Sequence, residues 1–582
     1  MALPGASSPQ AALARAPGRI TLEALAQLAR SQAQREWAGT PLHEWRIGKP
    51  KPSGFAARPK DLRPPRPEIG RRILAGEFAF AGSRLEVGRG GDPWDRPSPS
   101  RRFAIALHRF DWLRDLMALG EEGEAEALRL TLEWRRLFGR WNAFSWSAEV
   151  LERRVYNLAC AARALTERAS EAETLGLAHD LSRQARHLLA SPDGPARAAE
   201  RAIAAALAGT ALTGEAGLRL LDKALGHLAR ALPITVQPDG GHASRSPQAA
   251  LELLFDLTCL DEALVQRGVA APDEMMRAID RLAGAVRFFT LADGSLPALQ
   301  GGEALRPGYV AAARASDEAA RPIPPARNGY QRLEGRSLQV LADGAPPAEG
   351  PWSTAACAQP LAVEVLAKGQ RLIVGAGWTP DALAPASVRL ADGASTATLG
   401  DGACGKPLEG LAARILGPRL IAGYRRVEVE RHDGETAVWL EMEHEGWAGP
   451  YALRHQRRLY LDIAADELRG EDRFSPTAPS EEGSEASKRF IPFMVRFHLH
   501  PEVRASVALD RKSVLLRPPG DETGWWLRND AIEVVIEPSV YYQDGQPRRS
   551  NQVVLRGQAR QSAGARIRWK LAAAEAWPPH RT

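Results

Sequence analysis

The stretch AEVLERRVYNLACAARALTERA, residues 148–169, shows the pattern that decides the fold of the first half of the chain. Its apolar residues recur at intervals of three and four, which is the spacing of one face of an α-helix. The same pattern continues on both sides of this stretch, over residues 100–289. Alanine, leucine, arginine and glutamate, which all favour helices, are the dominant residues there. At least six helices are predicted, over residues 124–138, 148–169, 175–189, 195–207, 216–232 and 247–265. Such helices can pack as a bundle, a solenoid or an incomplete (α/α) toroid, and periodicity alone does not choose among these.

The second half of the chain has a different pattern, which begins at about Asn328. Short segments alternate polar and apolar residues, or are continuously apolar, between turn residues, and this predicts strands. Many strands with few helices predict a large sandwich or stacked-sheet domain. The string SPTAPSEEGSEAS at 475–487 predicts a mobile loop. The predicted strands span residues 361–367, 371–374, 427–430, 437–443, 457–463, 514–517 and 531–537.

The first 99 residues differ from both halves. Residues 48–68 are rich in Lys, Arg and Pro, and proline lacks an amide donor, so we expect an arm that runs over a surface. Residues 74–88 alternate apolar with small or polar residues, which predicts a short hairpin. The predicted organisation is therefore an arm with a hairpin (1–99), a helical domain (100–327) and a β-domain (328–582).

Composition narrows the functional classes. The chain has 582 residues, 44% hydrophobic and 25% charged, with a net charge of +6, and it holds no apolar run near the roughly 20 residues that a membrane helix needs. Its four cysteines have no CxxC spacing, which argues against a zinc site and a disulfide framework. No helix-turn-helix, zinc-finger or RNP pattern is present, so we expect no nucleic acid partner. No metal or other cofactor is predicted.

Several local strings resemble the heparinase II/III-like family, especially its alphaproteobacterial branch. They occur in the family's order and spacing across nearly the whole chain. The resemblance implies an incomplete (α/α) toroid followed by an antiparallel β-sandwich. The strings are FDWLRDL at 110–116, PDGGH at 238–242 with RSP at 245–247, STATL at 395–399, HEGW at 444–447, RHQRR at 454–458, LRGED at 468–472 and RFHLHP at 496–501.

The resemblance also implies a reaction, the β-elimination of an acidic, uronate-containing polysaccharide. That chemistry requires a group that neutralises the substrate carboxylate, a Tyr or His base that removes the α-proton, and an acid that protonates the leaving oxygen. The partner implied is therefore an acidic polysaccharide. The resemblance implies the periplasm, because family members are often exported. The first residues here lack the apolar stretch of a secretory signal, so the compartment is left open, with the cytoplasm as the alternative.

The positions at which the family carries its catalytic side chains read differently in this chain. An Asn-His pair is usual on a toroid helix, and the matching positions are Pro195 and Ala196. A Tyr usually follows the DGGH string, where this chain has Ala249. A His of the β-domain is replaced by Cys357, and a thiol needs a lowered pKa to act as a base near neutral pH.

The DGGH string carries the first candidate residues that remain. His242 lies in a Gly-Gly turn, where backbone can approach a ligand closely, and it is a candidate catalytic residue. Arg245 could pair with a carboxylate or sulfate of the substrate. The alternative is a turn that leads into a helix, with Ser244 or Ser246 as its cap.

The β-domain carries a second set of candidates. His444 and His455 are predicted as catalytic, and Trp447 as part of a sugar platform. Arg454 and Arg457 are predicted to bind substrate from a positively charged strand face, with an ordinary solvated strand face as the alternative.

Two further sites rest on weaker patterns. Asn142 and Tyr156 could line a sugar cleft from a toroid helix, although aromatic residues at helical spacing are more often core. His498 and His500, at i and i+2, could bind a metal with Asp472, but structural hydrogen bonds are the favoured interpretation.

These observations support three hypotheses. The first is a polysaccharide lyase, with His242, His444 and His455 as its remaining catalytic candidates. The second is a non-catalytic carbohydrate-binding relative that has lost the active site. The third is an enzyme with a displaced site that uses Tyr309 or Tyr330.

Overall fold

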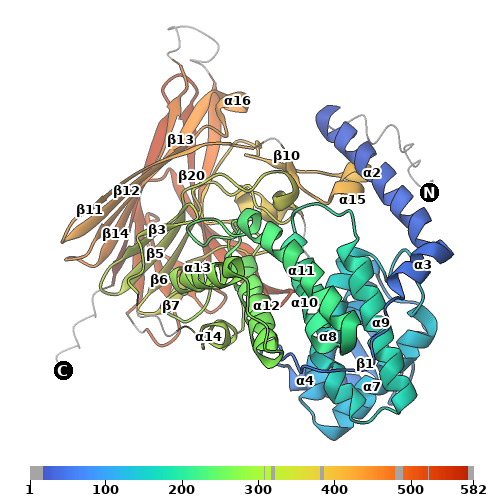
Figure 1. The fold of residues 1–582 in the computed structure, drawn as a ribbon. Helices are drawn as coiled ribbons and strands as arrows, with labels where there is room; N and C mark the ends of the chain where they lie inside the picture. The colour runs from blue at the N-terminus through green and yellow to red at the C-terminus, as the bar shows by residue number, and fades with distance from the viewer. Residues whose placement is uncertain are drawn as a thin grey trace, which may run out of the picture.

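The computed structural model of the chain describes residues 18–574 apart from 307, 316, 318–320, 380–385, 422, 479–488 and 522. It divides into a helical half and a β half (Figure 1). Most of the loop predicted at 475–487, and the first 17 residues, lie outside the described residues. None of the helices among the described residues is long and apolar enough to cross a membrane.

The N-terminal segment runs along both halves. Helix α2 (Gly18–Ala38) buries only Ala24 and Ala38, and it packs on α15 (Gly410–Leu416) of the β half. Thr40 caps the next helix by accepting a hydrogen bond from His43 N at 3.2 Å. The hairpin predicted at 74–88 is present. The other elements of this segment are α3 (Pro41–Ile47), α4 (Pro67–Leu74), β1 (Glu77–Phe80) and β2 (Ser83–Glu86).

The helical half is built around one alanine-rich helix, α10 (Ala198–Ala211). Twelve of its fourteen residues are buried, and it packs against α8, α9, α11 and α12. A helix that is apolar on every side must be surrounded by others, and alanine lets neighbouring backbones approach closely. The helices are α5 (Arg101–Arg109), α6 (Trp112–Met117), α7 (Glu121–Phe138), α8 (Ala148–Thr166), α9 (Glu171–Leu189), α10, α11 (Gly214–Thr235), α12 (Pro247–Gln266), α13 (Asp273–Phe289) and α14 (Tyr309–Arg314).

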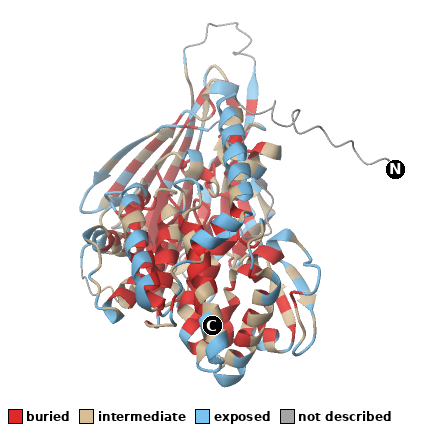
Figure 2. Cartoon of the chain, turned by 45° about the vertical axis from the view of Figure 1, so that its right-hand side comes forward, coloured by how far each residue is buried: buried red, intermediate tan, exposed pale blue. Residues whose placement is uncertain are grey.

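The β half is a sandwich of two antiparallel sheets. Buried and exposed residues alternate along strands of the eight-stranded sheet, such as β13 (Figure 2), because successive side chains of a strand point to opposite faces. The eight-stranded sheet has the order β11 (Val427–Asp433), β12 (Ala437–His444), β13 (Leu453–Asp462), β14 (Glu467–Pro476), β21 (Ala565–Ala573), β18 (Trp525–Asn529), β17 (Ser513–Arg517) and β16 (Arg504–Val507).

The nine-stranded sheet packs on the eight-stranded one through a shared apolar core. Phe493 of this sheet, for example, lies 4.6 Å from Phe474 of the other, centroid to centroid. Its order is β19 (Glu533–Gln543), β20 (Gln546–Arg560), β15 (Phe490–Leu499), β7 (Gln370–Val374), β6 (Val363–Ala367), β5 (Leu338–Asp343), β4 (Tyr330–Glu334) and β3 (Ala326–Arg327), with β8 (Ala397–Leu399) paired to β15. Smaller elements are β9 (Lys406–Pro407), β10 (Leu420–Ile421) and α16 (Ala448–Tyr451).

The nine-stranded sheet also meets the helical half. Arg371 of β7 pairs with Asp293 at 2.9 Å, just beyond α13, and Gln339 of β5 accepts a hydrogen bond from Ala292 N at 2.8 Å. The eight-stranded sheet therefore turns its outer face away from the helices (Figure 1). The predicted fold class, a helical toroid followed by a β-sandwich, is confirmed. Four of the six predicted helix starts differ from the observed ones. The difference that bears on the site is at α10, which begins at Ala198 and leaves Pro195 in the preceding turn.

Candidate functional site

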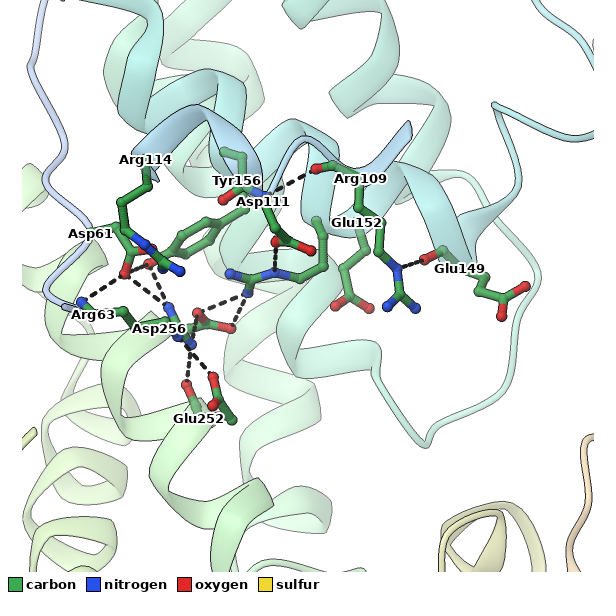
Figure 3. A network of polar contacts seen from close by, with 12 residues as sticks. Asp61, Arg63, Arg109, Asp111, Arg114, Glu149, Glu152, Tyr156, Glu252 and Asp256 are labelled. Atoms are coloured by element: carbon green, nitrogen blue, oxygen red, sulfur yellow. Dashed lines mark hydrogen bonds and ion pairs between the residues drawn. The ribbon is translucent and has the colours of Figure 1, made fainter. Parts of the chain in front are cut away.

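A polar network fills the interior of the helical half around Arg63 (Figure 3). Arg63 Nε donates to Glu252 at 2.8 Å and Nη2 to Asp256 at 2.7 Å, both on α12. Nη1 donates to Asp61 at 3.0 Å and to the Tyr156 hydroxyl at 3.2 Å. Because a buried charge is stable only when it is paired, these bonds tie the N-terminal arm to α12.

Two more arginines complete this Arg63 network. Arg153 of α8 donates to both carboxylate oxygens of Asp256, at 3.0 and 3.1 Å, and Arg114 donates to Asp61 at 2.6 Å. Burial alone would raise the pKa of Asp61, but Arg63 and Arg114 outweigh it and lower the pKa to about 2. The arginines are therefore neutralised by the protein's own carboxylates, rather than held ready for a substrate carboxylate.

Arg197 occupies the N-cap position of α10, next to Pro195 and Ala196, the positions at which the resemblance predicts the family's Asn and His. Its φ of 140° lies in the region that disfavours side chains. Its Nε donates to Glu152 of α8 at 2.9 Å, and its Nη1 lies 3.5 Å from Glu200. The Arg197 side chain is 58% exposed, which is more than the side chains of Arg63, Arg114 or Arg153.

The tyrosines of this region are not poised to act as bases. Burial raises the pKa of Tyr156 and of Tyr309, and the Tyr309 hydroxyl donates to Glu252 at 2.9 Å. Burial also raises the pKa of Tyr330, whose hydroxyl donates to the carbonyl of Arg245 at 2.9 Å. A displaced site built on Tyr309 or Tyr330 therefore lacks an ionised phenol near neutral pH.

His242 lies in the turn before α12, with its ring against Trp352 at 5.7 Å, centroid to centroid. Its Nδ1 accepts the backbone N–H of Ser244 at 3.1 Å and lies 2.7 Å from the Ser244 hydroxyl. A neutral imidazole with Nδ1 as acceptor carries its proton on Nε2. Burial lowers the pKa of His242 to about 3, so the ring is neutral at pH 7. Nε2, which is buried and has no partner among the described residues, is therefore a donor rather than a base.

Arg245 joins the two halves of the molecule. It pairs with Asp343 of β5 at 2.5 Å, and its guanidinium lies 4.8 Å from the ring centroid of Tyr330. It also donates to the carbonyls of Asn328, Ala345 and Pro346. These bonds use the donors that the sequence predicted for a substrate. The alternative cap is present as well, because Ser246 accepts from Ala249 N at 3.3 Å.

Cys357 lies buried near this junction. Gln300 holds its backbone, accepting from the N–H at 3.1 Å and donating to the carbonyl at 3.1 Å. Burial raises the pKa of Cys357 to about 11, so the thiol is protonated near neutral pH and is a poor base.

His444 and His455 form a chain of hydrogen bonds inside the sandwich. Gly446 N donates to His444 Nδ1 at 3.1 Å, His444 Nε2 lies 3.2 Å from His455 Nδ1, and His455 Nε2 lies 2.8 Å from Asp472 Oδ1. One pattern satisfies every step: each Nε2–H donates and each Nδ1 accepts. Burial lowers the pKa of both rings, so both are neutral. No ring nitrogen in this histidine chain is left for a substrate.

Asp472 ends the histidine chain and is shared by further donors. Arg457 binds both of its oxygens, at 2.8 and 3.1 Å, and Trp569 Nε1 donates at 3.0 Å. Burial would raise the pKa of Asp472, but Arg457 and His455 lower it below the usual range. Both Asp472 and Arg457 are fully buried. The predicted substrate-binding position of Arg457 is thus an interior one.

The remaining predicted site residues are dispersed. Trp447 is buried within the sandwich core, whereas Arg454 points outward and lies 3.5 Å from Glu443. The structure therefore separates Arg454 from His455 and Arg457, which face the opposite side of β13. Asn142 closes a turn by accepting from Ser145 N at 2.8 Å.

The two histidines considered for a metal do not meet Asp472. His498 lies 2.7 Å from the Ser539 hydroxyl, and His500 follows the end of β15 and packs on Tyr541. The described residues contain no group of three or more His, Cys, Asp or Glu side chains arranged to hold a metal ion.

Sequence reasoning missed the side chains that organise these interiors. Asp61 and Arg63 lie far along the chain from Asp256, and nothing local marks them as a group. Asp472 was considered only as a metal ligand, although its place in the LRGED string next to the RHQRR string was a usable signal.

Comparison with known proteins agrees with this architecture. Residues 323–570 match the family described as "Heparinase II/III-like, C-terminal". A crystal structure of heparinase III superposes with a TM-score of 0.64 at 13% identity, covering 85% of this chain and 81% of that one. Heparan sulfate lyase HepC from Pedobacter heparinus gives a TM-score of 0.56 at 14% identity over 92% and 87%. These two likenesses establish the fold alone.

The chain belongs to the heparinase II/III-like family, and it is a relative of polysaccharide lyases in fold. Within that class it is 50% identical to FtsZ-localized protein C of Caulobacter vibrioides (strain NA1000 / CB15N). The alignment covers 564 residues, 97% of this chain and 98% of the other. The similarity to that protein is therefore much greater than to the lyases of known structure.

Proposed function

We propose that this chain is a non-catalytic member of the heparinase II/III-like family that acts by binding carbohydrate. We also propose that it is located with FtsZ in the cell. The single observation that carries the first part is the state of its imidazoles. His242 has its proton on the one nitrogen without a partner, and both nitrogens of His444 and of His455 are used inside the protein. A lyase needs an unprotonated base that faces the substrate.

The other requirements of β-elimination are also unsupported. The arginines of the Arg63 network are matched by Asp61, Asp256 and Glu252, so they do not supply a free cation for a uronate. The Cys357 thiol and the Tyr309 phenol both have raised pKa values. The second part of the proposal rests on the 50% identical relative, which is named for its localisation with FtsZ.

The catalytic part is tested by mixing purified protein with heparin, heparan sulfate, chondroitin sulfate, hyaluronan, alginate and bacterial exopolysaccharides. Absorbance of a 4,5-unsaturated uronate is followed over time, with a heparinase III as positive control. We expect no rise. A rise that His242→Ala abolishes would establish a lyase with an altered site and would overturn the proposal.

The location is tested separately with a fluorescent fusion of the full chain, imaged together with labelled FtsZ. We expect the two signals to coincide. A fusion that is evenly distributed while FtsZ remains assembled would remove this part and leave the catalytic part untouched.

A further inference from the structure

Five outward side chains form one row across the middle of the eight-stranded sheet. Trp439 of β12 is paired in register with Tyr460 of β13, and Tyr460 with Arg469 of β14. Arg469 is paired with Lys570 of β21, and Lys570 with Arg528 of β18. Since neighbouring strands lie about 4.8 Å apart, this outer row runs for roughly 19 Å. It presents two aromatic rings followed by three cations.

The outer row lies in an open groove of about 520 Å³. Five cationic and two acidic side chains line this groove, so its charge is positive. The two aromatic residues are well exposed, at 40% for Trp439 and 38% for Tyr460. The face lies on the side away from the helices, so the groove is separate from the region around His242 (Figure 1).

The next row on the same face has a different charge pattern. There Arg458 pairs with Glu441 at 2.6 Å and with Glu471 at 3.5 Å, and Arg568 pairs with Glu471 at 2.9 Å. Cations and carboxylates alternate along this row, so it neutralises itself.

The cations of the outer row are less fully matched. Arg469 and Lys570 share the carboxylate of Glu467, and Arg469 also lies 3.9 Å from Asp462, so two carboxylates face the three cations of the row. Arg528 makes no ion pair with any described residue, and its guanidinium lies 6.0 Å from the ring centroid of Trp526. The row therefore has donors left for an anion.

We propose that the outer row binds an anionic polysaccharide chain. Trp439 and Tyr460 would stack on the apolar faces of sugar rings, while Arg469, Lys570 and Arg528 would bind carboxylate or sulfate groups. A row of this length contacts several consecutive sugars. The inference rests on the proposed binding function and assigns it to a surface outside the helical half.

The geometry favours a polysaccharide over an acidic peptide. A peptide added as a new strand needs a free sheet edge, but β13, β14, β21 and β18 are all paired on both sides. A peptide bound as a helix needs a continuous apolar groove, whereas this groove is charged beyond its two aromatic rings. The outer row, with its aromatic rings and cations, instead fits a polymer whose repeating unit has both an apolar face and a negative charge.

The proposal is tested by the anisotropy of fluorescein-labelled heparin titrated with the full chain. We expect saturable binding that unlabelled polygalacturonate displaces and neutral dextran does not. Arg528→Glu should weaken binding about tenfold, since it replaces a charge-assisted contact by a repulsion. Trp439→Ala should weaken it to a similar extent, and the matched control Arg96→Glu, an exposed charge reversal on the helical half, should weaken it by less than about twofold.

Each outcome decides a separate question. Binding that both groove variants leave unchanged, or no binding to heparin or polygalacturonate, overturns the assignment of the outer row. Displacement by poly-glutamate but not by polygalacturonate would favour an acidic peptide instead, and binding only to phosphatidylglycerol vesicles would favour a membrane surface. Release of unsaturated uronate in the same samples would contradict the proposed function rather than the location of the groove. Circular dichroism and thermal unfolding of each variant show that it is folded.

Discussion

The two faces of the eight-stranded sheet carry the same residue types in opposite settings. On β13, His455 and Arg457 point inward and are fully buried, while Arg458 and Tyr460 point outward. Inside, His455, Arg457 and Trp569 all donate to Asp472, so the charges hold the sandwich together. Outside, the cations lie in an open groove and have room for another molecule. A shift of one residue along a strand thus separates a buried charge from one that lines the open groove.

The largest effect should come from removing the acceptor on the inner face. Asp472→Ala leaves the charge of Arg457 buried without its counter-ion and the donor of His455 without its acceptor, which should lower the free energy of unfolding by about 3–5 kcal/mol. Glu471→Ala, its outward neighbour on β14, should lower it by less than about 1 kcal/mol, because ion pairs near the surface contribute little. Urea unfolding of both variants measures the difference. Equal losses of unfolding free energy in the two variants would mean that charges on the inner and outer faces stabilise the protein to the same extent.

A smaller loss of stability should follow from adding a methyl group at Gly470, which packs directly against Trp569. A Cβ at Gly470 would lie 2.1 Å from the Trp569 ring, so Gly470→Ala should cost about 1–3 kcal/mol of unfolding free energy through overpacking. Gly449 of α16 has nothing within 4 Å of such a Cβ, and Gly449→Ala is the matched control. A Gly470→Ala protein as stable as the control would mean that the inner face adapts more readily than its packing suggests.

The inner face should contribute to the pH dependence of stability, together with other buried histidines such as His242. The pKa values of His444 and His455 are lowered by burial, so below their usual value near 6.5 the unfolded chain binds protons that the folded protein does not. Stability is therefore fully present above that pH and is lost as pH falls, with a limiting slope of about 1.4 kcal/mol per pH unit for each ring.

His444→Gln should remove one of these contributions, and chemical denaturation at pH values from roughly 7 to 5 would show a shallower slope. Gln456→Asn, an outward change on the neighbouring strand, should keep the slope of the unaltered protein. An unchanged slope in His444→Gln would mean that the ring is protonated equally in the folded and unfolded states.

The smallest effects on stability should come from the outer face. Trp439→Ala and Arg528→Glu should each change the free energy of unfolding by about 0.5 kcal/mol or less, because surface substitutions away from packed or paired groups are usually tolerated. Thermal unfolding measures this change. A large loss of stability in either variant would mean that its side chain stabilises the fold, and the contrast between the two faces would then not hold at that position.

Much of the fold was predictable from the sequence because periodicity is local. The pattern over residues 148–169 became α8 (Ala148–Thr166), and the hairpin at 74–88 became β1 and β2. The predicted strand at 457–463 proved to be the end of β13 (Leu453–Asp462), since charged residues at its start concealed the alternation. The site was less predictable. His444, His455 and Arg457 were selected as a group, yet the sequence does not show which side of a sheet is the interior.

The sequence by itself determined the order of helices and strands and the heparinase II/III-like resemblance, and it supplied the prediction that Pro195, Ala196, Ala249 and Cys357 stand at the expected catalytic positions. These follow from residue type and spacing along the chain. Only the tertiary structure decided that the histidine chain is closed inside the sandwich and that the outer row forms one continuous line. Both depend on the pairing of strands far apart in sequence, because that pairing sets which charges meet a partner and which meet solvent.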